Sequence, residues 1–177
     1  SGTMGNGIAQ VSASSGYVTY LLDSNKDILQ KGFETIKKNL ERQLKKKKIK
    51  QSNVNTIIDN INITTDYSHL SQCDVIIEAA IEKQSIKENI FISLDKISNK
   101  NTILATNTSS ISIDKLAEVT TKPEKVIGMH FMNPVPIMKL VEIIKGRKTD
   151  ATTISKIIDL SKKMGKIPME CNDSPGF

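Results

Sequence analysis

The sequence predicts an α/β fold in which helices and strands alternate around a doubly wound, mainly parallel sheet. Short apolar runs rich in β-branched residues alternate with segments of helical apolar periodicity along the whole chain. One run, residues 73–80, is almost continuously apolar, as is typical of a parallel strand covered on both faces. Polar or acidic residues follow several of these runs, at the strand ends where open α/β sheets bind ligands.

The length and composition indicate one domain of 177 residues with a sizeable core. Trp is absent and aromatic residues are few, so Ile, Leu, Val and Met must fill that core. Much of the net charge of +6 comes from residues 37–50, where seven of fourteen residues are Lys and one is Arg. Such a local charge suits an anionic small molecule or a solvated helix better than nucleic acid, and no nucleic-acid partner is predicted.

Two cysteines, Cys73 and Cys171, lie far apart without the spacing of a metal site or a disulfide framework. We therefore predict no metal ion and a reducing, cytoplasmic location. No apolar run approaches the length of a membrane span, so no membrane association is expected. The chain starts without Met, so the sequence leaves open whether a targeting segment precedes Ser1.

The first residues of the chain contain half of a dinucleotide-binding motif. Gly2 and Gly5 have the spacing of the last two glycines of G-x-G-x-x-G, and a helix follows them to about residue 15. A strand at 17–22 then ends at Asp23, where a carboxylate accepts hydrogen bonds from the adenine ribose and favours NAD over NADP. The alternative is that Asp23 caps the helix that follows it. The ribose role is favoured, and with it a Rossmann-like sheet whose first strand is missing from the sequence.

The next elements continue the alternation. A long amphipathic helix is predicted from 27 to about 50. Its lysines either interact favourably with the negative end of the helix dipole or bind a phosphorylated ligand. A helix at 52–61, a strand at 63–66 and the strand at 73–80 follow, and Glu78 lies near the end of the latter. Lys83 is close enough to pair with Glu78, either at a ligand site or as a plain surface ion pair.

The second half begins with a helix at 85–98 and a strand at 102–107. The polar cluster 107–114 that comes next contains ordinary turn and cap residues, and alone it indicates no catalysis. A short helix to about 119, strands at 125–132 and 139–145, a helix at 152–163 and a strand at 167–171 complete the pattern.

Two of these apolar strands each contain an ionisable residue, His130 and Glu142, placed six residues to either side of Pro136. This symmetry would bring the two side chains together across antiparallel strands joined by the turn at 133–136. Burying an unpaired ionised carboxylate costs roughly several kcal/mol, so Glu142 needs either a partner or a raised pKa that keeps it protonated. The pair is interpreted either as a base and its orienting group or as a clamp that only fixes the strand register.

Five blocks of sequence carry a resemblance to a known family. They are Gly-Thr-Met-Gly-Asn-Gly-Ile-Ala from residue 2, Ile-Ile-Glu-Ala-Ala-Ile-Glu at 76–82, Ala-Thr-Asn-Thr-Ser-Ser at 105–110, Gly-Met-His-Phe-Met-Asn-Pro-Val-Pro-Ile-Met-Lys-Leu-Val-Glu at 128–142, and Ser-Pro-Gly-Phe at 174–177. Over essentially its whole length the chain resembles the N-terminal NAD-binding domain of L-3-hydroxyacyl-CoA dehydrogenases, with the bacterial 3-hydroxybutyryl-CoA branch most similar.

The resemblance implies interconversion of a 3-hydroxyacyl-CoA and a 3-ketoacyl-CoA with NAD as the cofactor. It implies that His130 is the catalytic base, that Glu142 is its partner, and that Ser109 binds the substrate oxygen. Lys46 would contact the CoA phosphates, although neighbouring lysines could take its place. The NAD contacts would fall on Gly2, Thr3, Met4, Gly5, Asp23, Glu78, Lys83, Asn107 and Asn133. The family also implies a homo-oligomer.

Measured against this family, the sequence lacks the strand before Gly2 and the all-helical domain that follows the NAD-binding domain. We assign 1–173 to the NAD-binding domain and 174–177 to the start of the next one. Losing a central strand would expose unpaired backbone, so these 177 residues alone are expected to fold poorly and to be part of a longer protein. We expect the natural protein to exceed 19.6 kDa in mass.

Two other functions stay open. A β-hydroxyacid dehydrogenase acting on a free acid shares the glycine-rich loop, but generally uses Lys as its acid-base group, and the His-Phe-Met-Asn-Pro block argues against it. A module that binds NAD or acyl-CoA without turnover is the alternative outside enzymes.

Overall fold

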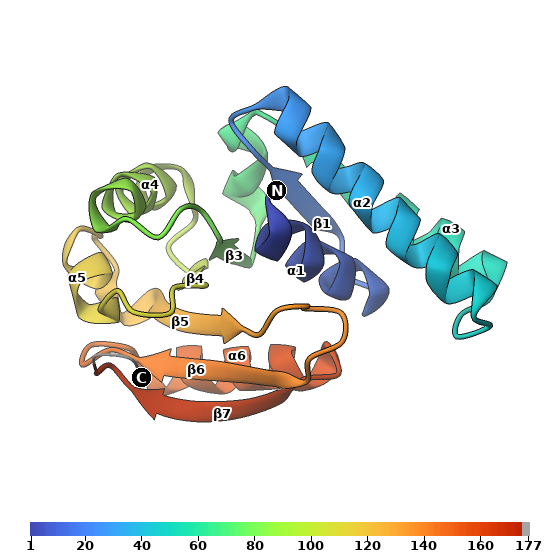
Figure 1. Cartoon of the computed structure of the whole chain (residues 1–177). Helices are drawn as coiled ribbons and strands as arrows, with labels where there is room; N and C mark the ends of the chain where they lie inside the picture. Colours follow the sequence, from blue (N-terminus) through green and yellow to red (C-terminus); the bar gives the residue numbers. More distant parts are fainter. Residues whose placement is uncertain (175–177) are drawn as a thin grey trace. The chain divides into compact units, whose positions relative to one another are not determined.

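The computed structural model describes residues 1–174 and divides the chain into two compact units (Figure 1). The first unit comprises residues 1–66 and 133–137, and the second comprises 67–132 and the residues from 138 onward. Apart from Ser174, the predicted start of a further domain at 174–177 lies outside the described residues.

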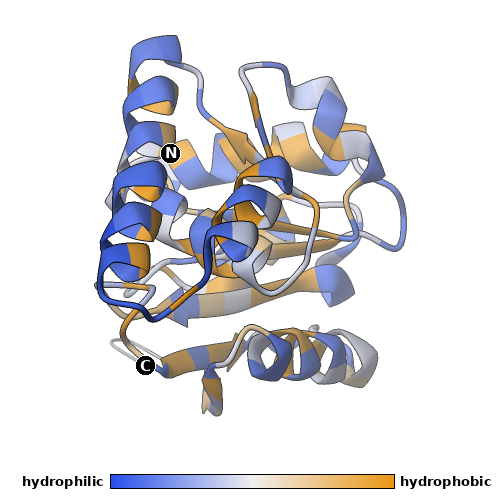
Figure 2. Cartoon of the chain, turned by 90° about the vertical axis from the view of Figure 1, so that its right-hand side faces the viewer, coloured by the Kyte–Doolittle hydropathy of each residue, from blue (hydrophilic) through white to orange (hydrophobic). Residues whose placement is uncertain are grey.

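The first unit contains a small parallel sheet and three helices. Its elements are α1 (Thr3–Ser14), β1 (Thr19–Leu22), α2 (Lys26–Lys45), α3 (Gln51–Asp59) and β2 (Ile61–Thr64). β1 pairs with β2 in parallel, and the apolar side of each helix packs into one core that includes Leu21, Ile36 and Leu40. In Figure 2 the helices show hydrophilic residues on one side and hydrophobic residues on the other, as the apolar periodicity of the sequence predicts.

The second unit is built on a five-stranded sheet. Its elements are η1 (Tyr67–Gln72), β3 (Val75–Glu78), α4 (Gln84–Ile97), β4 (Ile103–Thr106), α5 (Ile113–Glu118), η2 (Pro123–Lys125), β5 (Val126–Phe131), β6 (Leu140–Lys145), α6 (Ala151–Lys163) and β7 (Ile167–Asn172). The strand order is β3-β4-β5-β6-β7, with β3, β4 and β5 parallel, β6 antiparallel to β5, and β7 parallel to β6. All four residues of β4 are buried, and α6 packs against β5, β6 and β7.

The predicted α/β class with parallel strands is confirmed. Within residues 1–174, β1 pairs only with β2 and β3 pairs only with β4, so the strands form two separate sheets. The predicted helices and strands are all present, with shifts of a few residues at their ends. The two 3₁₀ helices were not predicted, since such short turns carry no apolar periodicity.

The largest error in element length concerns α2, which ends at Lys45 rather than near Lys50. Lys47 adopts the left-handed conformation with φ of 55°. The Lys48 N–H donates to the Gln43 carbonyl at 2.9 Å and the Lys47 N–H to the Leu44 carbonyl at 2.8 Å, which together form a Schellman motif. Glycine usually marks this position, and here lysine occupies it, so the sequence lacked the usual stop signal.

Candidate active site and cofactor-binding residues

His130 and Glu142 lie directly opposite each other on β5 and β6. The His130 Nδ1 and the Glu142 Oε2 are 2.8 Å apart, and the two side chains are 19% and 23% exposed. The predicted approach across an antiparallel pair is therefore confirmed, and Glu142 does have a partner. The pair is partly open to solvent rather than fully buried, which allows a ligand to reach it.

The loop that carries Ser109 starts beside the strand that carries His130. We call residues 107–112, between β4 and α5, the serine loop. The Asn107 N–H donates to the Glu78 carbonyl at 2.7 Å, and the Asn107 Oδ1 accepts the backbone N–H of Phe131 at 2.8 Å. Asn107 thereby ties the beginning of the serine loop to the residue that follows His130. Its predicted contact with NAD stays a prediction.

The serine loop also contacts a carboxylate that sequence reasoning missed. Glu82 Oε1 accepts the hydroxyl of Thr108, the N–H of Ser109 at 2.9 Å and the hydroxyl of Ser110 at 3.2 Å. Ser109 itself is exposed, so its hydroxyl is open to a ligand. The signal for Glu82 in the sequence is that it is the second acid of the 76–82 block.

The pKa of Glu82 reflects two opposed effects. Partial burial raises this pKa, but hydrogen bonds from Thr108 and the Ser109 backbone, together with the charge of Lys87, outweigh it. The net result is that the pKa of Glu82 lies below its ordinary value. Glu82 is therefore ionised at neutral pH, and its hydrogen bonds to the serine loop are charge-assisted.

The predicted pair of Glu78 with Lys83 is wrong. Glu78 instead binds Lys87, whose Nζ lies 2.8 and 2.9 Å from the two carboxylate oxygens, and the Lys87 side chain is fully buried. Thr106 also donates its hydroxyl to Glu78 at 2.7 Å. Glu78 is only 5% exposed, so its carboxylate serves the packing of α4 on β3 and β4. For this reason we do not carry Glu78 into the proposed cofactor site.

In the first unit, α1 begins in the form expected of a phosphate-binding helix. Gly2 is its N-cap, no side chain caps the helix, and no acidic residue lies in its first turn. A Cβ built on Gly2 or Gly5 would meet no atom of the described residues within 4 Å, and neither glycine has a positive φ. The protein's own packing therefore does not require glycine there, whereas close approach of a pyrophosphate to the backbone N–H groups would. The residues present fit NAD.

Asp23 follows β1 and does not cap α2. The cap is Asn25, whose side chain accepts the N–H groups of Asp27 and Ile28 at 2.9 and 3.0 Å. The Asp23 carboxylate accepts the Asn25 N–H at 3.0 Å and hydrogen bonds from Ser1. The alternative role weighed for Asp23 is thus wrong, and its ribose role stays a prediction.

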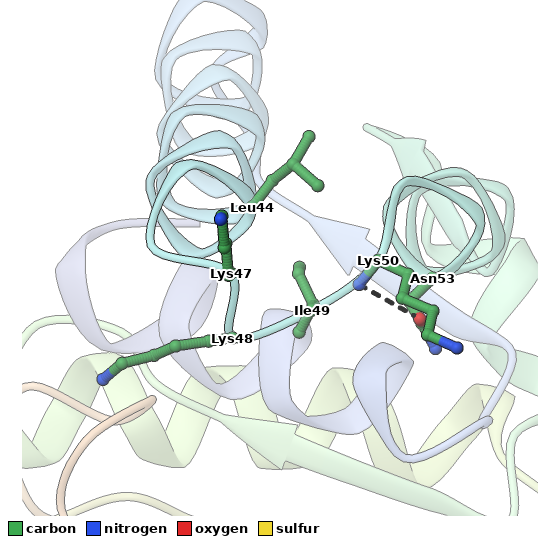
Figure 3. A pocket seen from close by; sticks show the side chains of 6 residues that line it. All are labelled: Leu44, Lys47, Lys48, Ile49, Lys50 and Asn53. Carbon is green, nitrogen blue, oxygen red and sulfur yellow. Dashed lines mark hydrogen bonds between the residues drawn. The ribbon is translucent and has the colours of Figure 1, made fainter.

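The lysine-rich end of α2 forms an open hollow on the first unit (Figure 3). Its lining residues are Leu44, Lys47, Lys48, Ile49, Lys50 and Asn53. Lys46, the residue predicted to meet CoA phosphates, is exposed next to the hollow but does not line it. The positive charge expected there is present, and the neighbouring lysines share it.

The other predicted NAD contacts are accessible. Thr3 is exposed and Met4 is half-buried in the first turn of α1, Lys83 is the exposed N-cap of α4, and Asn133 is exposed before Pro134. Asn133 and Pro134 are joined by a cis peptide bond.

No group of three or more His, Cys, Asp or Glu in the described part could hold a metal ion. None of the helices in residues 1–174 is long and apolar enough to cross a membrane.

Comparison with known proteins gives a consistent picture. The family model described as "3-hydroxyacyl-CoA dehydrogenase, NAD binding domain" matches residues 1–174. A 3-hydroxybutyryl-CoA dehydrogenase of Clostridioides difficile is 44% identical over 177 residues, which cover 100% of this chain and 63% of that protein. The mitochondrial hydroxyacyl-coenzyme A dehydrogenase of Sus scrofa is 41% identical, with 99% of this chain and 58% of that protein covered.

The fold agrees with solved structures as well. The (S)-3-hydroxybutyryl-CoA dehydrogenase PaaH1 from Ralstonia eutropha superposes with a TM-score of 0.98 at 44% identity, over 99% of this chain and 62% of that chain. The chain thus spans about 60% of the length of these relatives. The family assignment indicates NAD as the cofactor. The chain belongs to the family of NAD-binding domains of 3-hydroxyacyl-CoA dehydrogenases.

Proposed function

We propose that the protein containing this chain interconverts (S)-3-hydroxyacyl-CoA and 3-ketoacyl-CoA with NAD, and that 3-hydroxybutyryl-CoA is its substrate. The observation that carries the proposal is the 2.8 Å contact between His130 Nδ1 and Glu142 Oε2 on paired strands. Relatives named as 3-hydroxybutyryl-CoA dehydrogenases support the choice of acyl chain.

His130 is the acid-base group in this proposal. When its Nδ1–H donates to Glu142, the Nε2 atom is the unprotonated, basic nitrogen that takes the proton from the 3-hydroxyl. Glu142 fixes this tautomer, and its charge stabilises the imidazolium that forms. In the reverse direction the imidazolium returns the proton to the oxygen of the 3-ketoacyl group.

Ser109 orients the same substrate oxygen through its hydroxyl. Its exposure at the tip of the serine loop supports this role. The N-terminus of α1, from Gly2 to Gly5, would hold the NAD pyrophosphate, and Asp23 would hold the adenine ribose. Lys83, Asn107 and Asn133 are the further NAD contacts that we propose. When bound, NAD supplies the acceptor for the hydride that leaves C3.

The CoA end of the substrate carries phosphates, and the lysines around Lys46 would bind them. Family resemblance supports a homo-oligomer.

Two free cysteines in the described part of the chain support a reducing compartment, which we propose is the cytoplasm.

Spectrophotometry of NADH oxidation tests the proposal on protein produced from its complete reading frame. We expect rapid reduction of acetoacetyl-CoA and no measurable reduction of free acetoacetate. Reduction of acetoacetate at a similar rate would instead assign the protein to the dehydrogenases of free hydroxy acids. NADH binding in a calorimeter without reduction of either compound would show a binding module.

A further inference from the structure

Glu82 lies in the segment between β3 and α4, and a single atom of it holds the serine loop. Its Oε1 accepts the N–H of Ser109 at 2.9 Å and the Ser109 hydroxyl at 3.4 Å. The same atom accepts the hydroxyls of Thr108 and Ser110. The backbone of Ser109 is thus held more closely than its hydroxyl, which is free to turn toward a substrate while the loop stays in place.

Thr108 is the second anchor of the loop. Its side chain is buried, and while its hydroxyl donates to Glu82, the oxygen accepts the N–H groups of Ser110 at 3.3 Å and Ile111 at 2.9 Å. One hydroxyl therefore closes the turn and fastens it to Glu82. Without the carboxylate, the Thr108 hydroxyl and the Ser109 N–H would lose their acceptor.

The other carboxylate oxygen of Glu82 forms an ion pair with a buried lysine. Lys87 Nζ lies 3.4 Å from Glu82 Oε2 and is fixed by its closer contacts with Glu78. Because Lys87 is fully buried on α4, the chain of contacts from Glu78 through Lys87 to Glu82 is rooted in the core. The serine loop therefore takes its position from α4 as well as from β4.

We propose that Glu82 is a positioning residue for the dehydrogenase reaction: it holds the serine loop so that the Ser109 hydroxyl meets the substrate oxygen. This inference rests on the proposed function. It explains why a charged side chain lies against three consecutive hydroxyl residues.

A double-mutant cycle on protein from the complete reading frame tests the inference, with kcat for acetoacetyl-CoA reduction as the readout. If Glu82 acts through Ser109, Glu82→Gln and Ser109→Ala each lower kcat about tenfold, and the double variant is within about twofold of the slower single variant. Losses that multiply in the double variant would overturn the inference. So would a normal kcat for Ser109→Ala beside a low kcat for Glu82→Gln.

Two further comparisons separate positioning from general damage. Thr108→Ser keeps the anchoring hydroxyl and should retain most of kcat, whereas Thr108→Val removes the hydroxyl and should lower kcat even well below the temperature at which the variant unfolds. Glu88→Gln removes a charge from α4 at a residue that contacts Gln84, and it should leave kcat unchanged. An equal loss in Thr108→Ser and Thr108→Val would contradict a role for the hydroxyl.

The two proposals fail in different ways. Wild-type protein that does not reduce acetoacetyl-CoA would overturn the proposed function and this inference with it. Wild-type protein that turns over normally, with independent effects of Glu82 and Ser109, would overturn this inference alone.

Discussion

Asp150 illustrates how one residue of the second unit couples a helix cap to an ion pair. It is the N-cap of α6: one carboxylate oxygen accepts the Thr153 N–H at 2.5 Å, and the other contacts Lys125 Nζ at 2.7 Å. The hydrogen bond from Lys125 is the main reason why the pKa of Asp150 is lowered from 3.8 to about 2. A lowered pKa means that the folded state binds this proton less readily than the unfolded state does.

We therefore expect an acid-sensitive contribution from Asp150. Its stabilisation is complete above pH 3.8 and disappears as the pH falls toward about 2. Asp150→Ala should lower the free energy of unfolding at pH 7 by about 1 kcal/mol and flatten its dependence on pH between 4 and 2, roughly. Urea unfolding at several pH values measures both effects. Asp159→Asn, at an exposed position on the same helix, is the control, because Asp and Asn have similar helix propensity, and it should change the free energy of unfolding little.

Residue identities predicted some contacts of the site and not others. His130 and Glu142 were predictable because their strands pair about a single turn, and the alternation of side chains then places both on one face. The partner of Glu78 was not predictable, because the shorter distance along the sequence favours Lys83 over Lys87. The structure prefers Lys87 because α4 starts at Gln84, and its first turn directs Lys87 into the core while Lys83 stays exposed before the helix.

At the scale of elements, α1 contains two glycines with different demands. Gly5 faces open space, whereas a Cβ on Gly7 would come within 2.9 Å of the Val135 Cβ, and Val135 is buried. The first glycine is therefore a candidate for contact with a ligand, and the second is needed for packing of the 133–137 segment against α1.

Alanine at these two positions should have opposite effects on stability. Gly5→Ala should raise the free energy of unfolding by about 0.5–1 kcal/mol through helix propensity while weakening NADH binding at least tenfold. Gly7→Ala should lower the free energy of unfolding by about 1–2 kcal/mol, because Val135 must shift. Thermal unfolding and NADH titration of both variants measure these changes. Unchanged NADH affinity in Gly5→Ala would contradict a pyrophosphate site at the start of α1.

Elements were predictable where their ends carried a chemical signal. The helices α2 and α6 were predictable because polar residues stand just before their apolar periodicity begins, although the cap of α2 is Asn25 and not Asp23. The end of α2 was missed because Lys47 takes the left-handed conformation that glycine normally marks.

For the whole molecule, the net charge of +6 is concentrated rather than spread. The hollow at the end of α2 gathers Lys47, Lys48 and Lys50 on the first unit. An anionic substrate would be attracted there, and salt would screen the attraction. This concentration was predictable from the sequence, and the contact of Lys46 or its neighbours with CoA phosphates stays a prediction.

Charge removal at this hollow should therefore raise KM for acetoacetyl-CoA. We expect Lys47→Gln with Lys48→Gln to raise KM severalfold at low salt, to leave kcat nearly unchanged, and to weaken the salt dependence of KM. The matched control changes Lys162 and Lys163, two exposed lysines at the end of α6, to Gln and should leave KM unchanged. Equal effects in the two double variants would point to general charge rather than to this site.

The central claim is that His130 and Glu142 act as a base and its orienting group, and kcat tests it most directly. In protein from the complete reading frame, His130→Ala and Glu142→Gln should each lower kcat for acetoacetyl-CoA reduction by about 10²- to 10⁴-fold, with NADH affinity nearly kept. Turnover close to that of the wild type in either variant would show that the pair only holds β5 and β6 in register, and would contradict the claim.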